Sequence, residues 1–250
     1  MKKLAMCVLA LLLAAAPALG EDAARGFEGS GFASPEEAVT AYLQAMKAGD
    51  VAGMLSTFAI ETYVDEGDPR AYLERTWSFT PIVNAGVPIQ NAYVRNLAVS
   101  RRYAELAQSL YMQYLFHAWP EEYGAFSTET LPLQGEDAVE AFLTAMSGST
   151  FAASLSEMEI GEFIDPSTLS EYYLSDNNQQ IIARQAEICG CDELVDVAAS
   201  LSIDGEDWVQ CMWVARYGER WYNLSLSGNI GILLAIDAYA AGLAPVAELS

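Results

Sequence analysis

The sequence predicts an α+β protein, with helices in its N-terminal part and an antiparallel sheet in its C-terminal part. Two observations carry this prediction. Apolar residues recur every three to four positions in several segments before residue 190, as in amphipathic helices, and they alternate with mainly polar or small residues from 195 to 203, as in a strand. Apolar residues make up 52% of the 250 positions, which is enough for a packed core.

The first twenty residues have the layout of a secretory signal peptide. Two lysines precede an apolar run that ends in Ala18-Leu19-Gly20. A retained membrane anchor is the alternative, but about 16 apolar residues are fewer than the roughly 20 that span a bilayer. We therefore expect residues 1–20 to be removed, the exported chain to begin near Glu21, and residues 21–33 to form a flexible N-terminus.

The region 34–133 is predicted to be mainly helical. Its first helix begins at Ser34-Pro35, an N-cap residue followed by proline at the first helical position, and ends near Gly49. Its longest helix is expected from 99 to 119, with a stripe of residues that is typical of core packing: Tyr103, Leu106, Leu110 and Tyr114. The single histidine, His117, lies at the end of this stripe, where a positive charge would suit the helix dipole.

The segment from 36 to 46 recurs from 136 to 146 with seven of eleven residues identical. The repetition indicates either an ancient duplication or two helices that converged on common helix-forming residues. In both cases the apolar stripe predicts a helix. We expect the two helices to occupy comparable positions against the sheet or to pack on each other, burying Tyr42 with Leu43 and Phe142 with Leu143.

Residues 134–250 are predicted to form a helix and the antiparallel sheet, in one compact unit with the preceding region. After the repeated helix, the pattern predicts a strand from 158 to 164 and a helix from 169 to 188. Three more strands follow at 195–203, 208–217 and 220–226.

The turns between these last strands determine which residues face each other. A tight turn at Gly218-Glu219 would place Trp213 opposite Leu224. For the preceding turn we expect three residues, from Asp204 to Glu206. A two-residue turn would move one apolar set to the other face of the sheet, where we expect solvent.

Two parts of the sequence resemble the nuclear-transport-factor-two-like superfamily, which includes ketosteroid isomerase and SnoaL-type cyclases. Residues 34–58, which begin SPEEAVTAYLQAMKAGD, resemble its opening helices, and residues 209–227, which contain YGERWY, are similar to its closing hairpin. The resemblance covers less than a third of the chain, and the region from about 60 to 133 departs from it. It implies a strongly bent antiparallel sheet wrapped around helices, a cone with an apolar pocket. No residue of this chain matches the catalytic residues of the isomerases.

The chain also resembles exported proteins of Gram-positive bacteria, most clearly from Ser225 to Leu234. This second resemblance implies no activity.

The charge of the chain excludes several classes of partner. It has 34 acidic against 12 basic residues, a net charge of −22, whereas nucleic acids and anionic lipid surfaces are bound by clusters of basic residues. The apolar stretch 228–247 contains Asn229 and Asp237 and is interrupted by glycine and proline. We therefore predict a short helix or a subunit contact there rather than a membrane span.

We expect no metal site and no cofactor. Cys189 and Cys191 provide too few ligands for a closed zinc site, and we expect Cys211, beside Ala199, to be too far away to join them. The cysteines are therefore expected to be free or easily oxidised thiols, and a strained bridge between Cys189 and Cys191 is the alternative. Three acidic clusters lack the ligand pattern of a calcium-binding loop: 65–68, 176–178 and 204–207.

The predicted function is an exported, non-catalytic module, secreted or associated with the cell envelope, that binds a ligand or another protein. In the implied cone, the predicted ligand-binding residues are Tyr42, Trp213 and Tyr222. The expected partners are an apolar small molecule, an envelope protein or a second copy of the chain. The alternatives are a small lyase, isomerase or hydrolase that uses acidic and tyrosine residues in a cone-shaped pocket, and a structural scaffold. The lack of a histidine base or nucleophile motif favours binding.

Overall fold

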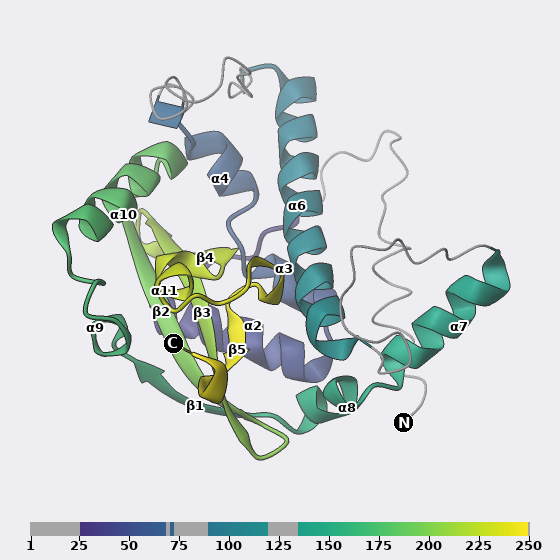
Figure 1. The fold of residues 1–250 in the computed structure, drawn as a ribbon. Coiled ribbons are helices and arrows are strands. Elements are labelled where there is room, and N and C mark those ends of the chain that lie inside the picture. The colour runs from purple at the N-terminus through teal and green to yellow at the C-terminus, as the bar shows by residue number, and fades with distance from the viewer. Residues whose placement is uncertain (1–25, 69–70, 73–89, 120–134, 250) are drawn as a thin grey trace.

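The computed structural model describes residues 26–68, 71–72, 90–119 and 135–249 (Figure 1). It confirms the α+β architecture, with helices first and an antiparallel sheet at the C-terminal end. The predicted leader and parts of the region 34–133 lie outside the described residues.

The N-terminal helices begin where local sequence signals place them. The Ser34 hydroxyl accepts a hydrogen bond from the Glu37 N–H at 3.2 Å, which caps the first helix as predicted. The longest helix starts earlier than predicted, because Asn91 caps it through the Val94 N–H at 3.2 Å. The helices of this part are α2 (Pro35–Ala48), α3 (Val51–Ser56), α4 (Glu61–Glu66) and α6 (Ala92–Ala118).

The later helices lie before, between and after the strands along the chain. The helix predicted from residue 169 begins only at Asp176, because the Ser175 hydroxyl accepts from the Asn178 N–H at 3.3 Å and caps it there. These helices are α7 (Glu136–Ser147), α8 (Thr150–Glu157), α9 (Pro166–Leu169), α10 (Asp176–Cys189), α11 (Gly228–Leu233) and the 3₁₀ turns η2 (Ala238–Ala240) and η3 (Val246–Glu248). The short α11 agrees with the prediction of a short helix in the apolar C-terminal stretch.

The sheet is antiparallel, with the order β1-β2-β3-β4, and β5 also pairs with β3. Because β2 occupies one edge of β3 along almost its whole length, β4 and β5 share the other edge, end to end. The chain leaves this edge after β4, forms α11 and η2, and returns as β5. The strands are β1 (Glu159–Ile164), β2 (Glu193–Ile203), β3 (Glu206–Tyr217), β4 (Arg220–Leu226) and β5 (Leu243–Pro245).

The turn between β2 and β3 is shorter than predicted. Ile203 pairs with Glu206, so the loop contains two residues, Asp204 and Gly205. Both have positive φ angles, 55° and 78°, as a type I′ turn requires. The three-residue prediction is wrong because it assumed that one face of β2 meets solvent. Helices cover both faces, so the two-residue turn exposes neither apolar set.

The turn between β3 and β4 lies at Gly218-Glu219 as predicted, since Tyr217 pairs with Arg220. Further along β4, one extra residue changes the register. Trp213 pairs with Ser225 rather than with the predicted Leu224. Such a β-bulge leaves one residue out of the ladder and bends the strand, which local alternation did not reveal.

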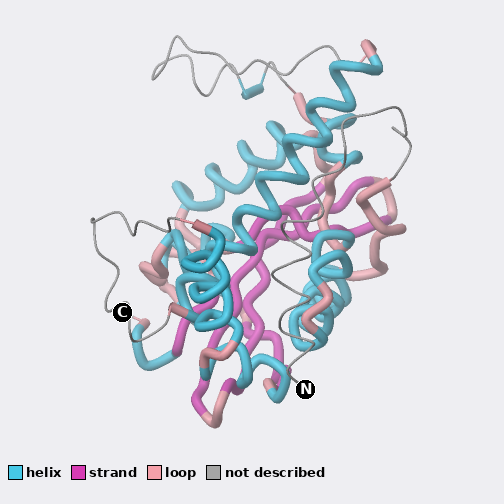
Figure 2. Tube along the Cα trace, turned by 90° about the vertical axis from the view of Figure 1, so that its right-hand side faces the viewer, coloured by secondary structure: helices cyan, strands magenta, loops and turns pink. Residues whose placement is uncertain are grey.

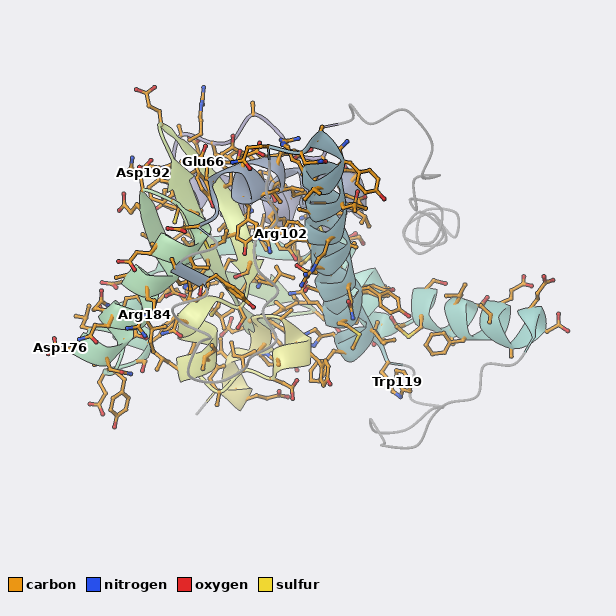
Figure 3. All side chains as sticks on the ribbon, turned by 90° about the horizontal axis from the view of Figure 1, so that it is seen from above. Glu66, Arg102, Trp119, Asp176, Arg184 and Asp192 are labelled. Atoms are coloured by element: carbon orange, nitrogen blue, oxygen red, sulfur yellow. The ribbon has the colours of Figure 1, made fainter. Side chains whose placement is uncertain are left out.

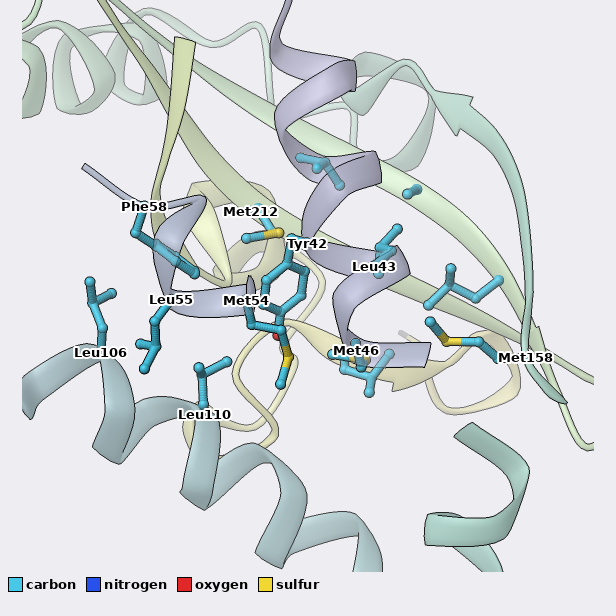
Figure 4. Packing of buried hydrophobic residues seen from close by; sticks show 14 of the residues in the cluster. Tyr42, Leu43, Met46, Met54, Leu55, Phe58, Leu106, Leu110, Met158 and Met212 are labelled. Carbon is cyan, nitrogen blue, oxygen red and sulfur yellow. The ribbon is translucent and has the colours of Figure 1, made fainter. Parts of the chain in front are cut away.

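The sheet lies between two sets of helices. α2 and α8 pack on one face, whereas α9, α10 and α11 pack on the other. Figure 2 shows the strands between these helices, in an open sheet that is consistent with a cone-like fold. The main core fills the space between the sheet, α2, α3 and α6 (Figure 4), and its labelled members include Tyr42, Leu43, Leu55, Phe58, Leu106, Leu110 and Met212.

The two helices with the repeated sequence neither occupy comparable positions nor pack on each other as expected, since α2 packs on α3, α8 and the sheet. Tyr42, Leu43 and Phe142 are buried as expected, whereas Leu143 is half-buried. Tyr42 and Leu43 of α2 are completely buried against the sheet. α7 instead packs on α6 and projects away from the sheet (Figure 3). Phe142 of α7 is buried, with its ring centroid 5.9 Å from that of Trp119 at the end of α6. The repeated sequence therefore predicts an amphipathic helix, but it does not determine which elements that helix packs against.

The described part of the expected flexible N-terminus is anchored to the body. Glu28 accepts hydrogen bonds from the N–H groups of Ile60 and Thr62 at 2.7 and 2.9 Å, and Phe32 forms a β-bridge with Trp221. These contacts hold residues 26–33 against α4 and β4. Within the described ranges, no helix is both long and apolar enough to cross a membrane.

Candidate functional site

Tyr42, the first predicted ligand-binding residue, is a core residue on the α2 side of the sheet. Its ring meets Phe58 edge to face, with centroids 5.8 Å apart, and its hydroxyl donates to Gln113 Oε1 at 2.9 Å. Burial raises the pKa of this phenol far above its ordinary value. Tyr42 is completely buried (Figure 4).

Trp213 and Tyr222 belong to a different cluster, on the sheet face that α10 covers. Tyr222 is paired with Ala215 on β3, and paired residues point to the same face. The structure therefore brings Trp213 and Tyr222 into one cluster but leaves Tyr42 on the opposite side of the sheet. Their role in binding a ligand stays a prediction.

The interior of the cone is filled by polar as well as apolar side chains. Gln113 of α6 donates to Gln210 Oε1 at 2.9 Å and to the Ala241 carbonyl at 3.1 Å, while it accepts from Tyr42. Gln113 and Gln210 are both buried. This chain of hydrogen bonds satisfies amides that burial would otherwise penalise, and it ties α6 to β3.

His117 is part of the core. Its Nε2 lies 3.1 Å from the Leu243 carbonyl, to which it must donate, and its ring contacts Phe151 and Trp208 at centroid distances of 5.1 and 5.2 Å. Burial lowers the pKa of His117 to about 4, so the ring is neutral at pH 7. The residue joins α6 to β5 as a neutral hydrogen-bond donor.

Asp196 is a buried carboxylate that the sequence placed on an exposed face. It lies on β2 under α11, and its Oδ1 accepts from the Ile230 N–H at 3.0 Å. Burial raises the pKa of Asp196 to about 6, although the Ile230 N–H opposes the rise. A raised carboxyl pKa is common at catalytic sites. Here, however, Asp196 is 5% exposed, and its carboxyl group links β2 to α11 through the Ile230 N–H.

The three cysteines among the described residues are thiols, and Cys189 and Cys191 do not form the strained bridge. Cys211 pairs with Ala198 rather than Ala199, because of the two-residue turn. Burial raises the pKa of both Cys191 and Cys211 to about 12, which makes them poor nucleophiles. Among the residues that the structure describes, no group of three or more His, Cys, Asp or Glu side chains could hold a metal ion.

A cleft of about 370 Å³ lies between α6 and the segment that runs from the end of β4 to β5. One wall is the face of α6 formed by Arg102, Glu105, Leu106, Gln108, Ser109 and Met112. The other wall consists of Ser225, Leu226 and Ser227 at the end of β4 and of Ala238, Tyr239 and Ala241 around η2. Both walls of the cleft therefore carry apolar and polar side chains.

Arg102 is the positive charge in the lining. Its guanidinium group donates to the Leu224 carbonyl and, through Nε at 3.4 Å, to the Ala59 carbonyl. The guanidinium carbon also lies 4.2 Å from the ring centroid of Tyr63. Figure 3 shows Arg102 on the side of α6 that looks toward the sheet. These contacts fix Arg102 as a link between α6 and β4.

The second wall has a strained backbone. Ser227 has a φ of 83° and Ala241 a φ of 48°, in the left-handed region that costs non-glycine residues about 1–3 kcal/mol. The Ser227 N–H donates to the Cys211 carbonyl at 2.9 Å, and the Cys211 N–H donates to the Gly242 carbonyl at 2.8 Å. A Cβ at Gly242 would collide with both neighbours, so glycine is required there. Strained backbone often marks a ligand site.

The sequence alone did not identify this cleft. Its walls are separated by more than one hundred residues, and no short motif connects them. The segment 225–234 resembles exported bacterial proteins, and this resemblance implies no activity. Tyr239 lies in an apolar stretch whose pattern predicts a short helix or a subunit contact. A 60% exposed tyrosine within an otherwise apolar C-terminal segment is visible as a feature only in the folded chain.

No family matches the sequence of this chain, and no curated protein matches it. Among solved structures, a cystatin-like protein from Ruminococcus gnavus is similar, with a TM-score of 0.43 and 13% sequence identity. The similarity covers 84% of this chain and 44% of that chain, so this chain spans less than half of its length. The resemblance to the nuclear-transport-factor-two-like superfamily is supported only as a shared α+β type of fold.

Proposed function

We propose that this protein is an exported, non-catalytic module that binds a small ligand in the cleft between α6 and the C-terminal segment. The observation that carries the proposal is the lining of the cleft, in which apolar side chains alternate with uncharged polar groups from α6 and from the C-terminal segment, beside the charged residues Arg102 and Glu105. Pockets of roughly 300–1,000 Å³ with such a lining are typical small-molecule sites. Export is proposed from the signal-peptide pattern of residues 1–20.

The positions of the reactive groups favour binding without turnover. Asp196 and Cys211 are buried, His117 is half-buried against Phe151 and Trp208, and none of the three lines the cleft. A substrate in the cleft would therefore not reach them. General acid–base or nucleophilic catalysis needs a reactive group within hydrogen-bond reach of the ligand. Of the lining residues that could act as an acid or base, Glu105 is held by Arg101, which leaves Tyr239.

A small ligand also fits the cleft better than a protein partner does. A stable protein interface buries about 800 Å² on each partner, which is the size of a broad surface patch. The cleft is a narrow feature between one helix and one loop segment. Binding to an envelope protein or to a second copy would need additional surface.

The proposal is tested by a thermal-shift screen of metabolites and cell-envelope fragments on the full chain, followed by product analysis of every hit. Ser109→Trp places a large ring in the cleft from an exposed position of α6. We expect hits to stabilise the wild type, to remain chemically unchanged, and to lose at least about tenfold in affinity with Ser109→Trp, because the ring occupies their site.

Ala104→Trp is the matched control, since Ala104 is also exposed on α6 but does not line the cleft. This variant should bind every hit like the wild type. Equal binding by Ser109→Trp would place the site elsewhere. Conversion of a hit into a product would contradict the non-catalytic part of the proposal.

A further inference from the structure

We infer that the ligand of this cleft is a neutral carbohydrate ring, an inference that rests on the proposed function and specifies its ligand class. The juxtaposition that carries it is an exposed tyrosine ring on one wall, hydroxyl groups on both walls with an amide on α6, and two charged side chains that already bond to other groups of the protein. Each of these features restricts the chemistry of the ligand.

The two charged residues in the lining are engaged within the protein. Arg102 donates to two backbone carbonyls and stacks on Tyr63. Glu105 accepts from Arg101 Nε at 2.7 Å. A charged ligand would compete with these contacts for the Arg102 guanidinium group and the Glu105 carboxylate. The net charge of −22 repels anions in general. A cation is attracted to the surface as a whole, but the one carboxylate of the cleft lining, Glu105, already pairs with Arg101. The cleft is therefore better suited to an uncharged ligand.

The remaining polar groups of the lining provide both donors and acceptors of hydrogen bonds. Ser225 and Ser227 carry hydroxyl groups on one wall, while Ser109 and Gln108 carry a hydroxyl and an amide on the other. The Ser109 hydroxyl donates to the Glu105 carbonyl at 3.0 Å, so it serves a ligand as an acceptor. Hydroxyl and amide groups match the alternating donor and acceptor character of a sugar hydroxyl. Because these groups come from facing walls, they would form hydrogen bonds with hydroxyl groups on opposite edges of a flat ring.

Tyr239 supplies an aromatic surface for one face of such a ring. Its side chain is 60% exposed at the cleft, and its backbone is fixed by the Asp237 carboxylate, which accepts from the Tyr239 N–H at 2.8 Å. The negative face of an aromatic ring attracts the weakly positive C–H groups on the apolar face of a sugar. Leu106, Met112 and Leu226 complete the apolar part of the cleft.

The test uses an array of neutral oligosaccharides together with their uronic-acid and amino-sugar counterparts, probed with the full chain. We expect binding to neutral glycans and at least about tenfold weaker binding to their charged counterparts. Tyr239→Ala should reduce the affinity for each neutral hit by about tenfold, whereas Tyr239→Phe, which keeps the ring, should stay within about threefold. Tyr172→Ala is the control, because Tyr172 is 64% exposed away from the cleft.

The outcomes separate this inference from the proposed function. The absence of any neutral glycan hit, equal binding of charged counterparts, or full affinity in Tyr239→Ala overturns the carbohydrate assignment. If, in addition, another compound class binds and Ser109→Trp blocks it, the cleft remains a binding site with a different ligand. If the glycan hits bind Ser109→Trp and the wild type equally, both the site and the inference fail.

Discussion

At the scale of single residues, burial rather than residue type determines the chemistry of this protein. The sequence pattern placed Asp196 on the polar side of a half-buried strand, and the structure places it under α11. No local sequence pattern predicts the burial of Asp196, because α11 comes from a segment more than thirty residues further along the chain. The same reason applies to Gln113, whose partners are Tyr42 and Gln210. Its position in an amphipathic helix gave no sign of them.

The raised pKa of Asp196 predicts a specific pH dependence of stability. Burial raises this pKa from its ordinary 3.8 to about 6 in the folded protein. The folded state then binds the proton more tightly than the unfolded chain does. The stability contributed by this residue therefore rises as the pH falls from above 6 to about 4, by up to about 3 kcal/mol.

The measurement compares the wild type with Asp196→Asn, which cannot titrate, in urea unfolding between pH 7 and pH 4. The other carboxyl groups are common to both proteins and cancel in the difference. We expect the free energy of unfolding of the wild type to increase relative to the variant as the pH falls. A difference that is constant with pH would show that Asp196 titrates normally.

At the scale of elements, the helices and strands that are marked by local sequence patterns could be predicted, whereas the pairing registers of the strands could not. Ser34-Pro35 and Gly49 mark both ends of α2, and the type of every strand from 193 to 226 follows from alternation. The register of β2 on β3 depended on whether one or two sheet faces are buried. The second face is buried by α10 and α11, and the residues of the hairpin do not indicate that these helices pack there.

The turn between β2 and β3 provides a test of this register. Gly205 has a φ of 78°, and a Cβ added there would meet nothing within 4 Å. The cost of Gly205→Ala is therefore a backbone cost alone, about 1–2 kcal/mol in the free energy of unfolding. Asp204→Asn is the control, since asparagine tolerates the left-handed conformation that Asp204 already adopts. Chemical denaturation should show a loss for the first variant and almost none for the second. Equal stability of Gly205→Ala would point to a longer, relaxed turn.

At the scale of the whole molecule, the candidate site is a product of assembly. α6 and the segment between β4 and β5 are brought together only by tertiary packing, so their lining residues could not be combined from sequence patterns. The predicted trio of Tyr42, Trp213 and Tyr222 failed to converge for the same reason, because the sheet separates α2 from α10. Composition, in contrast, is already a property of the whole chain, and its consequences can be tested directly.

The net charge of −22 predicts that salt stabilises this protein at neutral pH. Raising NaCl from about 0.1 M to about 1 M shortens the screening length from about 10 Å to about 3 Å, which weakens repulsion among the acidic residues. The ion pairs that salt would also weaken, such as Arg216–Glu193, are partly exposed and contribute little. We expect the melting temperature at pH 7 to rise with NaCl. The same series near pH 4.1, the isoelectric point of the sequence, should show a much smaller rise, because the net charge is then close to zero. An equal response at both pH values would mean that salt acts through hydration of apolar surface and not through charge.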